Sequence, residues 1–131
     1  LDDSGYSYLV GQYRFPLEDY SWEIPEGGGK HNIVPIESAK RELKEETGIS
    51  ASKWTEIQRL HTSNSVCDEL GIIYLAENIE LGKASPDEDE VLSIKKVHWS
   101  EMLEMVMKGE ITDSLSVAGI LKLAALKAND Q

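Results

Sequence analysis

The stretch AKRELKEETGI, residues 39–49, constrains the fold more than any other part of the chain, because its residues sort into faces only on a helix. At about 100° per residue, apolar positions at helical spacing form one stripe that a core can cover. The stripe consists of Ile36, Ala39, Leu43 and Thr47. Glu42, Glu45 and Glu46 lie together beside it, so the pattern predicts an amphipathic helix with an acidic flank.

The acidic flank carries an energetic cost. Glu42 and Glu46 are one turn apart, and such a like-charge pair destabilises a helix by roughly 0.2–0.5 kcal/mol. Arg41 is one turn before Glu45, which predicts that Arg41 holds Glu45. Glu42 and Glu46 then face the same space, where a divalent cation such as Mg²⁺, which prefers carboxylate ligands, would relieve the repulsion. From these residues alone, a solvated acidic surface is the alternative interpretation.

Length and composition limit the class of protein. A chain of 131 residues with 40% hydrophobic and 28% charged residues predicts one globular domain, residues 1–131, with strands before residue 1 expected in the native protein. No apolar run reaches the about 18 residues of a membrane span, so no membrane partner is expected. The net charge of −11 argues against nucleic acid as a partner. The single cysteine, Cys67, predicts a cytoplasmic location because it cannot form an internal disulfide.

Hydrophobic patterns predict the order of elements along the chain. Strands are expected over residues 6–14, 21–25, 53–62, 70–80 and 91–99, and helices over 37–47, 101–109 and from 113 onward. Pro35 lies near the start of the first helix and Gly48 follows its last turn, where a left-handed cap is usual. Ser100 is the expected cap of the second helix. The order predicts an α/β fold in which helices pack on a sheet.

The glycine-rich segment EGGGKHN and the helix after it resemble the Nudix box, G-x5-E-x7-R-E-U-x-E-E-x-G-U, in which U is aliphatic. The matching positions are Gly27, Arg41, Glu42, Leu43, Glu45, Glu46, Gly48 and Ile49. Ile33 replaces the first glutamate, which in the family helps to brace the loop and the arginine. The resemblance implies a Nudix α/β/α sandwich with a mixed sheet and the box as a loop-helix-loop.

Two flanking segments resemble one branch of that family. VGQYRFPLEDYSWEIPEGG and PDEDEVLSIKKVHW are similar to segments of ADP-ribose and nucleotide-sugar pyrophosphatases. This resemblance implies hydrolysis of ADP-ribose or a related nucleoside diphosphate sugar to a nucleoside monophosphate and a sugar phosphate. Asn64 stands where many ADP-ribose-selective members have proline, which predicts a broad range of sugars. The alternatives are cleavage of modified nucleoside triphosphates and a catalytically silent nucleotide-sensing module.

The resemblance also assigns site residues. The Mg²⁺ ligands, for which Mn²⁺ is a possible substitute, are expected to be Glu42, Glu46, Glu90 and the main-chain carbonyl of Glu26. The catalytic group is expected to comprise Glu88 as general base, a role that Glu90 could exchange with it, and Arg41 with Glu45. The substrate-binding residues are expected to be Arg14, Gly27, Gly28 and Glu69, although Arg14 could equally be a strand-edge arginine. A homodimer is expected because members of this branch pair through N-terminal strands.

Overall fold

The computed structural model describes residues 1–28, 32–85 and 93–130. The elements run β1 (Tyr6–Arg14), a 3₁₀ helix (Phe15–Leu17), β2 (Asp19–Glu23), α1 (Pro35–Thr47), β3 (Ser50–His61), β4 (Leu70–Glu80), β5 (Ser93–His98), α2 (Trp99–Met107) and α3 (Ser114–Asn129). The predicted order of strands and α-helices is confirmed, and the 3₁₀ helix directly follows β1.

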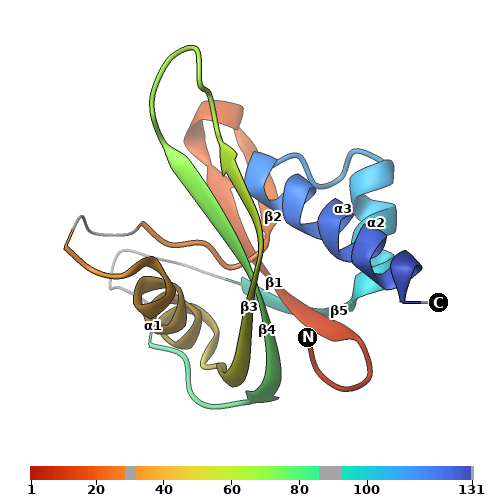
Figure 1. Cartoon of the computed structure of the whole chain (residues 1–131). Coiled ribbons are helices and arrows are strands. Elements are labelled where there is room, and N and C mark those ends of the chain that lie inside the picture. Colours follow the sequence, from red (N-terminus) through yellow and green to blue (C-terminus); the bar gives the residue numbers. More distant parts are fainter. Residues whose placement is uncertain (29–31, 86–92, 131) are drawn as a thin grey trace.

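The strands form two antiparallel units between helical layers. In the first, β1 lies between β2 and β5, and in the second, β3 pairs with β4. Figure 1 shows α1 on one side of the strands and the adjacent α2 and α3 on the other, which is the expected α/β/α layering. All strand pairings within the described ranges are antiparallel, so the parallel pairing that a mixed sheet requires does not occur there.

The closely packed core lies on the α2 and α3 side. It is formed by Leu9, Val97, Met102, Met105, Ile111 and Ile120. The apolar stripe of α1 is only partly enclosed, because Thr47 is buried whereas Ala39 and Leu43 line a cleft. The molecule therefore has a packed side against α2 and α3 and an open side against α1.

Local capping explains where the helices begin and end. Gly48 ends α1 with φ 78°, and its N–H donates to the Lys44 carbonyl at 2.9 Å, as predicted. The predicted cap at Ser100 is wrong, because α2 begins at Trp99 and the ring of His98 caps it by accepting from the Ser100 N–H at 3.2 Å. An imidazole nitrogen is outside the usual Ser, Thr, Asp and Asn signal for a cap. No described helix is long and apolar enough to cross a membrane.

Candidate active site

A cleft of about 820 Å³ lies between α1, the β3–β4 pair and α3. Its lining includes five of the residues predicted from the sequence, namely Glu26, Gly27, Gly28, Glu42 and Glu69. They come from the loop after β2, from α1 and from the segment before β4. Folding thus brings together predicted residues that are up to 43 positions apart, as Glu26 and Glu69 are.

The glutamates of α1 lie at and beside this cleft. The Glu42 side chain is 24% exposed, and Glu46 is buried. The Arg41 guanidinium lies 3.4 Å from a Glu42 carboxylate oxygen and 4.0 Å from one of Glu45. Arg41 therefore bridges both carboxylates, and its predicted contact with Glu45 is the longer of the two.

Gly27 packs directly against the side chain of Glu42. A Cβ atom built on Gly27 would lie 2.1 Å from Glu42 Cγ and 2.6 Å from Cδ, which is far inside van der Waals contact. At Gly28, no atom of the described residues lies within 4 Å of the equivalent position. Only a glycine at position 27 lets the loop approach α1 this closely.

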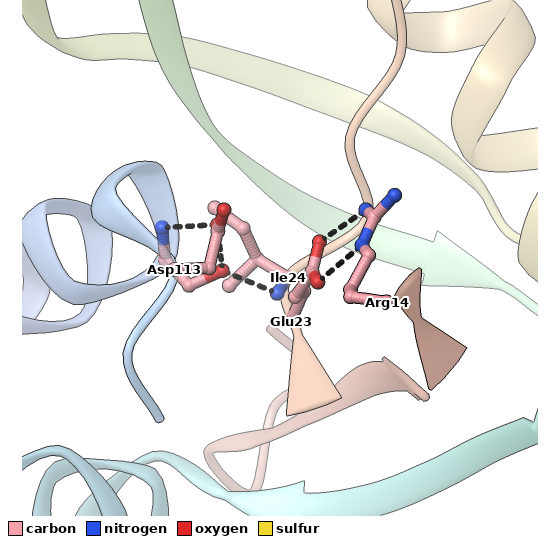
Figure 2. Close-up of polar contacts among 5 residues, drawn as sticks. Arg14, Glu23, Ile24 and Asp113 are labelled. Carbon is pink, nitrogen blue, oxygen red and sulfur yellow. Dashed lines mark hydrogen bonds and ion pairs between the residues drawn. The ribbon is translucent and has the colours of Figure 1, made fainter. Parts of the chain in front are cut away.

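A second group of acids lies where the loop after β2 meets α3. Carboxylate oxygens of Glu23, Glu26 and Asp113 lie within 4.8 Å of one another. Arg14, predicted to bind substrate, donates to the buried Glu23 through Nε at 2.9 Å and Nη2 at 2.7 Å (Figure 2). Hydrogen bonding to Glu23 is the main reason that the pKa of Arg14 is raised. The third guanidinium nitrogen of Arg14 points away from Glu23 in Figure 2.

The protonation of this group follows from its burial. Burial first, and then the neighbouring Asp113, raise the pKa of Glu26 to about 9. Burial acts in the same direction on Asp113, but hydrogen bonds with Glu26 and Ser116 outweigh it and lower the pKa of Asp113. Near neutral pH the geometry therefore favours a neutral Glu26 beside an ionised Asp113.

These carboxylates suit a divalent cation. Glu26 Oε2 is buried and has no hydrogen-bond partner among the described residues. Oxygen donors from carboxylates and main-chain carbonyls are the ligands that Mg²⁺ prefers, and a cation would take the place of the proton that the crowded acids hold. Gly27, the residue after Glu26, lies against Glu42, so the loop after β2 passes directly beside α1.

The predicted roles of Glu88 and Glu90 lie outside the described residues. The described part of the loop that leads toward them is attached to the end of α1. The Ser85 N–H donates to the Glu45 carbonyl at 2.8 Å, and a Cβ on Gly48 would lie 2.2 Å from the Gly82 carbonyl oxygen. Residues 82–85 therefore lie against the C-terminal turn of α1.

Sequence reasoning did not find Glu23 or Asp113 as members of the site. The only signal for Asp113 was its position at the start of a predicted helix, where it does cap α3 by accepting from the Ser116 N–H at 3.1 Å. Nothing local in the sequence indicates that this cap lies beside Glu26. That proximity is a product of tertiary folding alone.

The chain is similar to known proteins in sequence and in fold. A model of the NUDIX domain matches residues 1–115. An ADP-ribose pyrophosphatase of Bacillus subtilis (strain 168) is 35% identical over 130 residues, which cover 98% of this chain and 70% of that protein. An ADP-ribose pyrophosphatase of Mycobacterium tuberculosis (strain ATCC 25618 / H37Rv) is 33% identical over 132 residues, covering 96% of this chain and 62% of that protein. A crystal structure of an ADP compounds hydrolase has a similar fold, with a TM-score of 0.85 at 21% identity, over 96% of this chain and 68% of that one.

Proposed function

Since this chain belongs to the NUDIX domain family, we propose that it hydrolyses the pyrophosphate bond of ADP-ribose or a related nucleoside diphosphate sugar, releasing a nucleoside monophosphate and a sugar phosphate. The observation that carries the proposal is the convergence of the Gly27 loop and Glu42 on one cleft. It occurs in a chain that is at least 33% identical to two ADP-ribose pyrophosphatases.

The size and charge of the cleft suit such a substrate. Its volume of about 820 Å³ lies within the range of about 300–1,000 Å³ for small-molecule sites. The chain carries a net charge of −11, so the phosphates of a nucleotide sugar need cations to approach it. We therefore propose Mg²⁺, with Mn²⁺ as a substitute, held by Glu42, Glu46, the Glu26 carbonyl and Glu90. When bound, this metal supplies positive charge to the phosphate oxygens and makes bound water more acidic.

The residues of the chain itself orient the reacting groups. Arg41 restrains the carboxylates of Glu42 and Glu45, and Gly27 keeps the loop next to Glu42. Glu88 is proposed as the base that accepts a proton from the attacking water, and an exchange of roles with Glu90 remains the alternative.

On the substrate side, Gly28 and Glu69 line the cleft, where they are proposed to contact the phosphates and the sugar. Arg14 is proposed to use its third nitrogen for the substrate, because its other donors hold Glu23. Asn64, in place of the proline of selective members, leads us to propose that the distal sugar is held loosely.

We further propose a single-domain cytoplasmic homodimer. The support for the dimer is a set of exposed apolar side chains on β1, the 3₁₀ helix and β2. These are Tyr13, Phe15, Leu17 and Tyr20, with exposures of 49%, 82%, 61% and 45%.

A substrate panel tests the proposed activity. ADP-ribose, ADP-glucose, GDP-mannose and 8-oxo-dGTP would be compared by kcat/KM at one Mg²⁺ concentration, with products separated by chromatography and an EDTA control. The nucleotide sugars should give nucleoside monophosphate, and their rates should differ modestly, since each loosely held contact changes binding by only about 1–3 kcal/mol. Preference for the triphosphate by more than about tenfold, equivalent to about 1.4 kcal/mol, would contradict the assignment.

A further inference from the structure

Ser116, in the first turn of α3, is the most deeply buried polar residue in the part of the chain that the structure describes, with 0% exposure. Its hydroxyl donates to Asp113 Oδ2 at 2.7 Å and accepts from the Ile24 N–H at 2.9 Å. Both hydrogen-bonding capacities are therefore used, one within α3 and one across 92 positions of sequence.

The contact with Ile24 is not needed to cap the helix. Asp113 Oδ2 already accepts the Ser116 N–H at 3.1 Å, so α3 is capped without the hydroxyl. The hydroxyl instead supplies the acceptor for a main-chain N–H of another segment. Figure 2 shows that segment, Glu23 and Ile24, lying between Asp113 on one side and Arg14 on the other.

The segment held in this way is the start of the loop that meets α1. Ile24 precedes Gly27 by three residues, and Pro25 between them has a fixed φ and no N–H to donate. Three residues after Ile24, the chain rests against Glu42 through Gly27. Residues 24–27 are thus restrained at one end by the Ser116 hydroxyl and at the other by the side chain of Glu42.

We propose that Ser116 is a positioning residue for the metal site, setting the distance between the Glu26 carbonyl and Glu42 from a helix outside the box. The assignment of those two groups as ligands rests on the function proposed above. Without the hydroxyl, the Ile24 N–H loses its buried acceptor, which costs about 1–3 kcal/mol, and the loop end is released. Displacement of Ile24 then passes through Pro25 to Glu26 and Gly27, and the metal donors no longer converge.

Substitution Ser116→Ala tests the proposal with two readouts that do not depend on catalysis. The first is the hydrogen-exchange rate of the Ile24 amide, measured by NMR in EDTA. The second is the affinity for Mn²⁺ alone, measured by electron paramagnetic resonance without nucleotide. We expect the Ile24 amide to exchange about tenfold faster and the Mn²⁺ Kd to rise by about fivefold or more. Loss of a residue that orients metal ligands without touching the metal weakens metal binding to this extent.

Two matched variants separate positioning from stability. Ser100→Ala removes a hydroxyl that lies 2.8 Å from the ring of His98, the residue that caps α2. Like Ser116→Ala, this variant removes a serine hydroxyl in contact with a helix cap. In Val97→Ala, the core is weakened at a side chain that is 1% exposed. Each is compared at a temperature where circular dichroism shows a fully folded chain, and each should leave the Mn²⁺ Kd within about twofold of the parent.

Three results would overturn the proposal: a Ser116→Ala chain that binds Mn²⁺ within about twofold of the parent, a Val97→Ala chain that loses as much affinity, or a parent that binds no Mn²⁺. If Ser116→Ala does not fold, Ser116→Cys keeps the shape of the side chain at a slightly larger volume while offering only a weak acceptor. A Cys variant with a fast-exchanging Ile24 amide and the parent's Mn²⁺ affinity would equally refute the role. Because the titration contains no nucleotide, a wrong substrate assignment leaves this comparison intact.

Discussion

Gly27→Ala should disable the chain although it adds only one methyl group. The new Cβ would lie 2.1, 2.6 and 2.7 Å from Glu42 Cγ, Cδ and Cβ, whereas carbon atoms rest at about 3.5–4.0 Å. The loop and Glu42 must therefore separate by roughly 1 Å or more. Such overpacking typically costs about 1–3 kcal/mol of stability.

The larger effect of Gly27→Ala should be on catalysis. A displacement of about 1 Å at a positioned group can reduce the rate by about 10²-fold, which corresponds to about 2.7 kcal/mol. The assay is kcat/KM for ADP-ribose at saturating Mg²⁺, together with the thermal midpoint. Gly28→Ala is the matched control for the thermal midpoint, because a Cβ there meets no atom of the described residues within 4 Å and neither glycine has a positive φ.

The Gly28→Ala chain should keep the thermal midpoint of the parent; only its stability serves as the control, because Gly28 is itself proposed to contact the phosphates. A Gly27→Ala chain whose activity stays within about threefold of the parent would refute the steric argument. Equal losses of thermal midpoint in the two variants would refute it too, since they would point to the loop backbone and not to the contact with Glu42.

Other perturbations have equally direct outcomes. Glu46→Gln should remove nearly all activity while leaving the circular dichroism spectrum unchanged, because it deletes one negative charge from the proposed metal ligands. Activity within about twofold of the parent would exclude Glu46 as a ligand. Folded Glu26 keeps its proton up to a pKa of about 9 whereas the unfolded side chain loses it near 4.5, so its contribution falls as pH rises between these values. Glu26→Gln should therefore gain stability relative to the parent at about pH 8.5 but not at about pH 5 in EDTA, and a pH-independent difference in thermal midpoint would contradict this. Arg14→Ala leaves the Glu23 side chain, which is 4% exposed, without its bidentate partner and should cost about 2 kcal/mol in urea denaturation; Arg14→Lys should recover only part of it. Light scattering of the full-length protein at micromolar concentration should give twice the mass of one chain, and a monomer mass would refute the proposed dimer.

Features that depend on neighbouring residues could be predicted from the sequence. The order of strands and helices, the left-handed cap at Gly48 and the grouping of Glu42 with Glu46 all follow from periodicity and capping within a few residues. The family followed from the register of the box, since its residues share one loop and one helix. The cap of α2 was not predicted although it is local, because histidine is not among the residues that usually cap helices.

Features that depend on packing between distant segments came only from the tertiary structure. The sequence placed Arg14 on a strand end, but its bidentate pairing with Glu23 depends on how β1 meets β2. The hydrogen bond from Ile24 to Ser116 and the approach of Glu26 to Asp113 join segments about 90 positions apart. The physical reason is that helical and strand periods repeat within a few residues and carry no information on which distant surface will cover them. The sequence therefore determined that Glu42, Glu45 and Glu46 lie together on α1, and the tertiary structure decided which buried partners contact the loop after β2.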